Sequence, residues 1–298
     1  MSLRISWATV KETASDWLED DASRLAASLA YYSLLSLAPL LIIVVAIAGF
    51  FLGADAARGR VAGQLASVVG AVPAAGIQSV LASAHSPSSG AVSMVIGVVT
   101  LFIGASGVFG ELQSSLNTIW GVKPKPGRGI WGEVKARFFS FTMVLGVAFL
   151  LLVSLVVSSL LSAIGERFSS ALPGGEALWQ VVNFVFSLVS ITVLFALIFK
   201  YIPDAEIKWR DVWLGAIVTA GLFTIGKVLL GLYLGKAAVG SSYGAAGSLI
   251  ALVVWVYYAA QILFLGAEFT CVQARLHGRE IRPSDDAVRV AKDREVSA

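Results

Sequence analysis

The stretch YGAAGSLIALVVWVYYAAQILFLGAEFTCVQ, residues 243–273, contains a single charged residue, Glu268. A helix needs about 20 mainly apolar residues to cross the hydrocarbon core of a bilayer. This run exceeds that length, so it predicts a membrane-spanning helix rather than a helix in the core of a water-soluble protein.

Five more apolar runs precede it, and the six runs together make up most of the chain. They occupy approximately residues 25–52, 91–120, 138–164, 177–201 and 212–235. Over the whole chain 57% of residues are hydrophobic, 14% are charged and the mean hydropathy is +0.82. A soluble domain carries about 25% charged residues. We therefore predict an all-α polytopic membrane protein, a bundle of six transmembrane helices with short extra helices.

The lysines and arginines alternate in number between the runs. From the N-terminus, the seven segments outside the runs carry three, two, five, one, three, one and six of them, with Lys200 at the end of its run counted in the gap that follows, and Lys227 lies inside a run. Basic residues are retained on the cytoplasmic side of a membrane. The larger counts fall on both terminal segments and on every second gap, so we expect both termini in the cytoplasm.

The chain divides into three parts. Residues 1–24 are predicted to form a cytoplasmic or interfacial amphipathic segment, residues 25–275 the six-span membrane domain, and residues 276–298 a charged cytoplasmic tail. From residue 279 onward the tail is rich in charge and is expected to be disordered or loosely helical. Residues 54–90 are too poor in large apolar residues for a seventh span, and we predict an outer-face or re-entrant segment there.

The N-terminal segment has the periodicity of a helix with one apolar face. That face collects Trp7, Val10, Ala14, Trp17 and Leu18. This pattern predicts a helix on the inner membrane surface, with its tryptophans at the level of the headgroups. Acidic residues elsewhere on the helix argue against this, because anionic lipids would repel them. A cytoplasmic cap helix remains open as the alternative.

Small or polar residues recur along one whole face of the second predicted span. They are Ser93, Gly97, Thr100, Gly104, Gly107, Glu111, Ser114 and Thr118. Small residues let helix backbones approach closely in lipid, which favours a packing seam between helices. The alternative is that this face lines a solute pathway, and the presence of Glu111 on the same face supports that alternative.

Three charged residues lie inside predicted spans, namely Glu111, Lys227 and Glu268. A charge at the centre of a spanning helix costs about 2.5–3.5 kcal/mol. Lys227 can extend its amine toward the outer surface, whereas the two acids lie at similar depth on the inner side. Each acid is either half of a structural ion pair or a carboxylate that couples transport to protons or cations. We hypothesise that Glu111 and Glu268 approach each other or share basic partners.

No pattern in the sequence indicates catalysis. The two histidines, His85 and His277, fall on opposite sides of the predicted membrane, and His, Cys, Asp and Glu do not occur at metal-ligand spacing. A nucleophile elbow and a phosphate-binding loop are both missing from the sequence. Basic clusters flank the spans, which favours contact with anionic lipid headgroups over nucleic acid. We expect no enzymatic activity, no metal and no cofactor.

Four blocks of sequence carry a likeness to a known family. They are AASLAYYSLLSLAPLLI (26–42), ELQSSLNTIWGV (111–122), KYIPDAEIKWRDVWLGA (200–216) and YGAAGSLIALVVWVYYAAQILFLGAEFT (243–270). These blocks resemble the YihY/BrkB family of bacterial inner-membrane proteins, and the resemblance implies six spans in the inner membrane. The resemblance implies no chemistry. Some members carry the label ribonuclease BN, but this sequence shows no metal-binding nuclease site. The residues in the strongest blocks are Tyr32, Pro39, Glu111, Asn117, Pro203, Asp204, Tyr243, Gly244, Gln261, Gly266 and Glu268.

These observations together predict a transporter or exporter of a small solute or lipid. The alternative is a non-transporting membrane scaffold or envelope-assembly factor whose polar face only packs helices. Membrane lipids and a small solute or lipid are the expected partners, and the sequence leaves the oligomeric state open. The candidate residues of a substrate or ion pathway are Glu111, Glu268, Gln261, Tyr32, Asn117, Lys227 and Tyr243.

Overall fold

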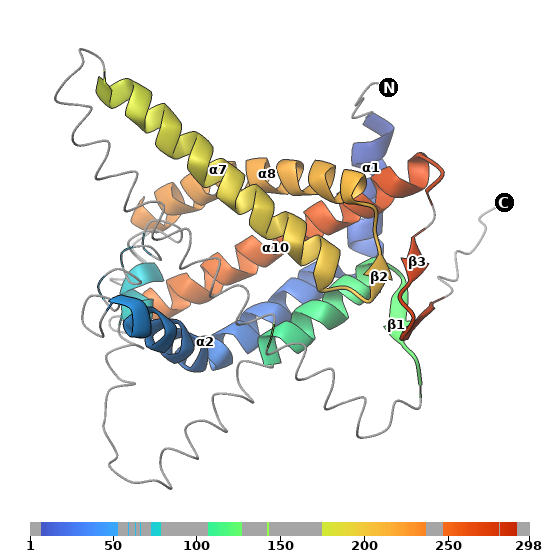
Figure 1. Ribbon diagram of the computed structural model, residues 1–298, viewed down its shortest axis with the longest axis horizontal. Coiled ribbons are helices and arrows are strands. Elements are labelled where there is room, and N and C mark those ends of the chain that lie inside the picture. Colours follow the sequence, from blue (N-terminus) through green and yellow to red (C-terminus); the bar gives the residue numbers. More distant parts are fainter. Residues whose placement is uncertain are drawn as a thin grey trace, which may run out of the picture.

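The computed structural model of the chain is mainly α-helical. It describes residues 7–52, 59, 63, 66, 73–78, 107–126, 142, 175–236, 247–279 and 281–290. Its long helices are α1 (Trp7–Glu19), α2 (Ala22–Leu52), α7 (Gly175–Tyr201), α8 (Trp209–Lys236) and α10 (Gly247–Leu276) (Figure 1). Shorter stretches at 73–78 and 107–119 are also helical.

Three of these helices contain a stretch that is long and apolar enough to cross a membrane. The stretches are Trp179–Tyr201, Trp209–Leu234 and Gly247–Leu276, with mean hydropathies of 2.5, 1.8 and 2.1. They correspond to the last three predicted spans, which confirms the helical fold class. The count of six spans stays a prediction, because residues 91–106 and, except for residue 142, residues 138–164 lie outside the described residues.

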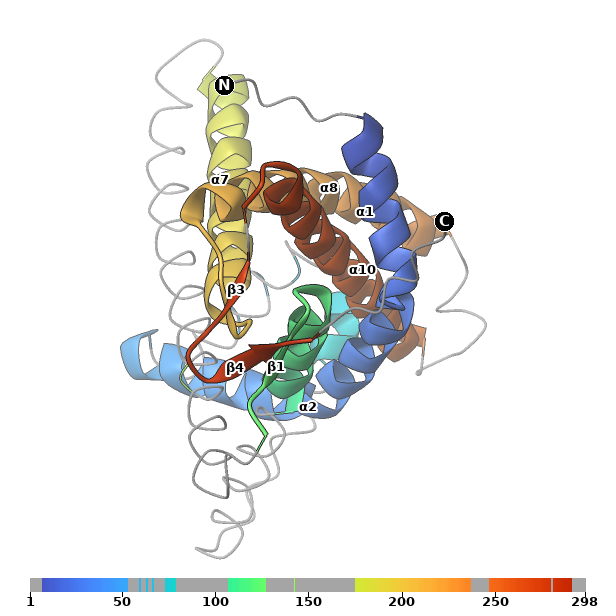
Figure 2. The same ribbon diagram turned by 90° about the vertical axis from the view of Figure 1, so that its right-hand side faces the viewer.

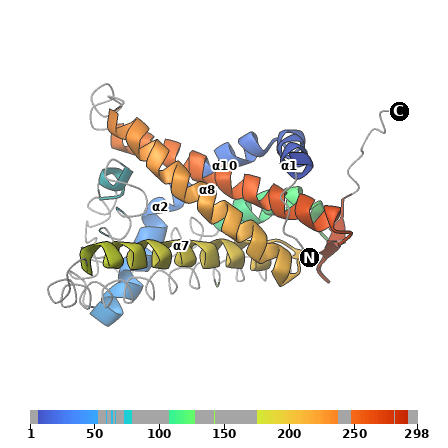
Figure 3. The same ribbon diagram turned by 90° about the horizontal axis from the view of Figure 1, so that it is seen from above.

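The long helices pack side by side around a shared apolar core. α8 contacts both α7 and α10, and α10 also contacts α2. Figure 2 shows these helices grouped around the helix 107–119, and Figure 3 shows α8 running along α10. Leu116, Phe199, Val212 and Phe264, from four different helices, are each 0% exposed in this core. The core therefore joins segments that are far apart in the sequence.

α8 and α10 meet at two reciprocal Gly-x-x-x-Thr motifs. A Cβ on Gly215 would lie 1.7 Å from Oγ1 of Thr270, and a Cβ on Gly266 would lie 1.8 Å from Oγ1 of Thr219. Each threonine hydroxyl donates, at 2.7 Å, to the carbonyl of the glycine four residues earlier on its own helix. The hydroxyls are thus satisfied, and the two backbones approach as closely as only glycine allows.

The small face predicted on the second span is described only from Gly107 onward. A Cβ on Gly107 would lie 3.4 Å from Cδ1 of Tyr32, so this position does pack against α2. Ser114 and Thr118 on the same face are exposed, because the helix turns the side that carries Leu116 toward the core. The prediction that the whole face is buried is wrong at this end. Ser93, Gly97, Thr100 and Gly104 lie outside the described residues.

The end of α10 reverses the direction of the chain. Gly278 has a φ of +64°, a left-handed conformation that glycine adopts without strain. Its N–H donates to the carbonyl of Arg275 at 2.9 Å, and the N–H of Arg279 donates to the carbonyl of Ala274 at 3.0 Å. This pair of bonds is a Schellman cap, and it directs the following residues back across the end of the helices.

Residues 281–290, called the C-terminal strap here, then form strands. β3 (Arg282–Pro283) pairs antiparallel with β2 (Ala205–Glu206), and β4 (Ala287–Arg289) pairs antiparallel with β1 (Val122–Pro124). The prediction of a disordered or loosely helical tail is therefore wrong for the strap. The charged composition of the strap did not predict strands, because strand pairing uses backbone groups and does not require apolar side chains.

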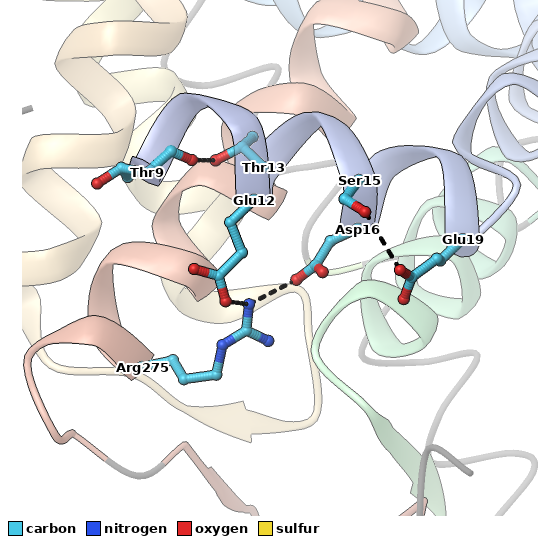
Figure 4. A network of polar contacts seen from close by, with 7 residues as sticks. All are labelled: Thr9, Glu12, Thr13, Ser15, Asp16, Glu19 and Arg275. Atoms are coloured by element: carbon cyan, nitrogen blue, oxygen red, sulfur yellow. Dashed lines mark hydrogen bonds and ion pairs between the residues drawn. The ribbon is translucent and has the colours of Figure 1, made fainter. Parts of the chain in front are cut away.

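The N-terminal helix, the strap and the two loops that it fastens all lie at one end of the helices. Nη2 of Arg275 lies 2.5 Å from Oε1 of Glu12 and 2.8 Å from Oδ2 of Asp16, which ties α1 to the end of α10 (Figure 4). At the other end of α10, a Cβ on Gly76 would come within 2.8 Å of the carbonyl oxygen of Ser248. The predicted cytoplasmic segments thus share one end, and part of the predicted outer segment lies at the other.

Candidate functional site

Asp204 connects three parts of the chain at the end where α1 and the strap lie. It exchanges two hydrogen bonds with Asn117: Nδ2 of Asn117 donates to Oδ2 of Asp204 at 2.9 Å, and the N–H of Asp204 donates to Oδ1 of Asn117 at 2.7 Å. Nε2 of Gln113 donates to Oδ1 of Asp204 at 3.2 Å. The carbonyl of Asp204 accepts the N–H of Ser284 from the strap at 2.9 Å. We call this group the Asp204 node.

Local sequence explains why these residues meet. α7 ends at Tyr201, shortly before Pro203, and proline cannot continue a helix, so Asp204 falls in a loop. Asn117 lies on the last turn of its helix, ahead of Gly121, whose φ is +64°. Asn117 was predicted as a pathway residue, but it is 4% exposed and uses its amide inside the node. That contact gives it a structural role, and a part in a pathway stays a prediction.

Asn117→Asp should lower the free energy of unfolding by about 1.5–3 kcal/mol, the range for hydrogen bonds to charged groups. The change replaces the Nδ2 donor, 2.9 Å from Oδ2 of Asp204, with a second carboxylate oxygen. Side-chain volume scarcely changes, so the loss is electrostatic. Thermal unfolding of the detergent-solubilised protein measures it. Adding Asp204→Asn restores a donor–acceptor pair and should recover most of the loss, whereas an equally unstable double variant would contradict the node.

Glu268 is 0% exposed and lies in the stretch of α10 that is apolar enough to span a membrane. It stands two residues from both Gly266 and Thr270, and residues two apart on a helix point about 200° apart. Its side chain is therefore directed away from the seam with α8. A fully buried carboxylate in such a helix is a candidate functional group.

Gln261 lies on the same stripe of α10 as Glu268, seven residues or about two turns earlier. Its Oε1 is buried and, within the described part of the chain, has no hydrogen-bond partner. Tyr257, 36% exposed, continues the stripe toward the other end of the helix. This stripe of α10 is thus buried at Glu268 and open at Tyr257.

The other predicted pathway residues are spread over separate elements. Tyr32 on α2 is 39% exposed, and Glu111 and Lys227 are half-buried on the helix 107–119 and on α8. Tyr243 lies outside the described residues. No hydrogen bond or ion pair among the described residues joins Glu111 to Glu268, and the hypothesis that they share basic partners stays a prediction.

Sequence reasoning missed the contacts that hold the helix ends together. Nη1 of Arg279 pairs with Oδ1 of Asp211, which is 3% exposed, and Arg275 pairs with two acids of α1. Each of these charges is indistinguishable from ordinary surface charge in the sequence. The close seam between α8 and α10 did leave a signal, namely the repeated Gly-x-x-x-Thr at 215–219 and 266–270.

Comparison with known sequences assigns the chain to a family. Residues 13–290 match the family described as virulence factor BrkB. The chain belongs to the BrkB family. This confirms the resemblance found in the four blocks of sequence. The match runs from within α1 to the end of the strap, so all the described contacts of the Asp204 node lie inside the BrkB-family region.

Curated relatives of this BrkB-family chain carry the name UPF0761 membrane protein. The relative from Pseudomonas aeruginosa strain LESB58 is 30% identical over 182 residues, which is 59% of this chain and 41% of the relative. That from Verminephrobacter eiseniae is 28% identical over 273 residues, 90% of this chain and 62% of the relative. The relative from Ralstonia nicotianae is 29% identical over 251 residues, which is 84% of this chain and 55% of the relative. The chain therefore covers about half the length of these relatives. No solved structure matches it.

Proposed function

We propose that this BrkB-family chain is an inner-membrane transporter or exporter of a small solute or lipid, and that it is not an enzyme. The proposal includes six spans, both termini in the cytoplasm, and residues 54–90 on the outer face or re-entrant. The observation that carries transport is Glu268, a fully buried carboxylate in a stretch apolar enough to span a membrane.

Burial of an ionisable residue in a membrane helix is costly, and such residues mark ion or substrate pathways. Uncharged residues are sufficient to pack helices, as the seam between α8 and α10 demonstrates. Retention of a carboxylate at Glu268 therefore supports a role beyond packing, such as alternation between a charged and a neutral form as an ion or solute moves. The buried Oε1 of Gln261 adds a polar atom on the same stripe.

Basic residues support the proposed orientation. The end of the helices that holds α1 and the strap also carries several exposed basic side chains. They are Lys123, Lys125, Lys208, Arg210, Arg282 and Arg289. Lysine and arginine are retained on the cytoplasmic side, so this end is assigned to the cytoplasm.

A non-transporting scaffold is the second candidate, and the Asp204 node favours it. The polar side chains of Asn117 and Gln113 are used there in internal hydrogen bonds. Polar residues in the family blocks can therefore serve the fold alone. On this alternative Glu268 belongs to a structural ion pair, and the chain positions other envelope proteins.

Glu268→Gln distinguishes the two functions because it removes the charge and keeps the shape. If the chain is a transporter, we expect flux in proteoliposomes to fall at least about tenfold, which corresponds to about 1.4 kcal/mol in activation free energy. The melting temperature should then stay nearly unchanged. If the chain is a scaffold, the same change leaves a buried partner charge uncompensated and lowers the melting temperature. The compound for the assay is the one that most stabilises the solubilised protein in a panel of polar solutes and lipid classes.

Glu206→Gln is the matched control, because Glu206 is exposed on β2. It should keep both flux and melting temperature. A protein that is stabilised by no solute and moves no lipid between the leaflets of a vesicle would contradict transport. A Glu268→Gln variant with full flux would contradict the role of Glu268.

A further inference from the structure

α1 is docked against the rest of the protein with its polar side inward. Thr9, Thr13 and Asp16 are 2%, 4% and 4% exposed, whereas Trp7 and Leu18 are 80% and 68% exposed. On the inward side, Oγ1 of Thr13 donates to the carbonyl of Thr9 at 2.8 Å. A helix surrounded by water has the opposite arrangement, with apolar residues inside. The outward side of α1 therefore fits an apolar medium better than water.

Two acids of α1 bond an arginine at the end of α10. Arg275 bonds both Glu12 and Asp16, at 2.5 and 2.8 Å, and the side chain of Asp16 in that pair is only 6% exposed. Figure 4 shows the guanidinium of Arg275 between the two carboxylates. The sequence argument against a membrane position was that anionic lipids repel these acids. Arg275 offsets that repulsion in part, at Glu12 and Asp16.

The surface of α1 divides into three stripes. The stripe against the protein holds Thr9, Thr13 and Asp16. A second, exposed and apolar, holds Trp7, Val10, Ala14 and Leu18. A third, exposed and mostly polar, holds Lys11, Ser15 and Glu19. Trp17, expected on the apolar stripe, packs against the core instead. A helix that lies beside a spanning helix at a membrane surface needs these three sides, for protein, lipid and water.

The direction and level of α1 agree with that position. In Figure 1 α1 runs across α10, and in Figure 2 α1 is seen lengthwise while α10 is foreshortened. A helix across a spanning helix lies in the plane of the membrane. The same end of the bundle carries Tyr201, Trp209 and Trp213, which are 47%, 41% and 42% exposed and in contact with one another. Exposed tyrosine and tryptophan are enriched where membrane meets water.

We propose that α1 is an interfacial helix whose apolar stripe inserts between the headgroups and acyl chains of the leaflet in which α10 ends. Arg275 is the clamp that fixes the rotation of α1 so that the stripe faces lipid. The lipid is the surrounding bilayer itself, because the stripe borders a helix that is long and apolar enough to span it. The inference requires α10 to cross the membrane and is independent of transport.

Spin labels in nanodiscs of phosphatidylethanolamine and phosphatidylglycerol test the position. In a Cys271→Ala background, Leu18→Cys places a label on the apolar stripe and Ser15→Cys places one on the polar stripe. The Leu18 label should collide more often with oxygen, which concentrates in lipid, than with a water-soluble nickel chelate. The Ser15 label should show the reverse. Val10→Cys provides a second apolar site should Leu18→Cys fail to fold.

Two results would overturn the proposal. One is equal access of the nickel chelate to the apolar and polar stripes. The other is dipolar broadening between labels on the apolar stripe, which would mean that a second copy of the chain covers it. Arg275→Gln tests the clamp separately: the label at Leu18 should become more mobile, and an unchanged spectrum would show that Arg275 does not set the rotation of α1.

Discussion

Gly266→Ala should lower the free energy of unfolding by about 3 kcal/mol or more, the upper part of the range for overpacked cores. The added Cβ would lie 1.8 Å from Oγ1 and 2.9 Å from Cβ of Thr219. Rotation of the threonine moves its Oγ1 but not its Cβ, so α8 and α10 must separate to relieve the contact. Thermal unfolding and size-exclusion profiles of the solubilised protein measure the effect.

Glycines elsewhere on α8 are matched controls. A Cβ on Gly221 or Gly231 would meet nothing within 4 Å, and alanine is a better helix former than glycine by about 0.8–1.0 kcal/mol. Gly221→Ala and Gly231→Ala should therefore leave stability unchanged or raise it. Combining Gly266→Ala with Thr219→Gly should recover part of the loss, because the neighbouring side chain is removed. A Gly266→Ala protein as stable as Gly221→Ala would contradict the seam.

Arg279→Gln should lower the free energy of unfolding by about 3 kcal/mol, the lower end for a broken buried ion pair. The carboxylate of Asp211 is 3% exposed and loses the guanidinium that bonds it. The side chain of Arg279 is 18% exposed, and solvent screening there keeps the effect at this lower end. Arg279 also begins the return of the chain toward the strap, so backbone amides of the strap should exchange hydrogen faster in the variant.

The control for this pair is a charge removal at an exposed arginine. Arg282→Gln, on β3, should change stability by less than about 0.5 kcal/mol, as surface substitutions usually do. Adding Asp211→Asn to Arg279→Gln removes the uncompensated charge and should recover most of the loss. If Arg279→Gln and Arg282→Gln unfold at the same temperature, the ion pair contributes nothing to stability.

The helical fold was predictable because a membrane span depends on local properties. Length and apolar composition alone locate α7, α8 and α10, and the alternation of basic residues places the termini at the same end. Which side of the membrane that end faces remains a prediction. That Glu268 lies inside an apolar helix was likewise predictable from local sequence, whereas the burial of its side chain depends on how the helices pack.

The contacts between helix ends were not predictable because they are non-local. Asn117 and Asp204 are separated by 87 positions in the sequence, and hydropathy gives no information about which loops meet. The strap was mistaken for a disordered tail because its pairing is made by backbone groups, which composition does not reveal. The α8–α10 seam was not predicted because its two Gly-x-x-x-Thr motifs, at 215–219 and 266–270, do not show locally that they meet each other.

The strap also sets an order of events during synthesis. The strands it pairs with, β1 and β2, leave the ribosome well before residues 281–290, and their unpaired edges stay open until the strap arrives. At about 5–20 residues per second, the interval between β2 and the strap is on the order of ten seconds. Premature termination before residue 281 would leave the edges available for wrong pairing. Pairing of both loops therefore waits for the described segment that is made last.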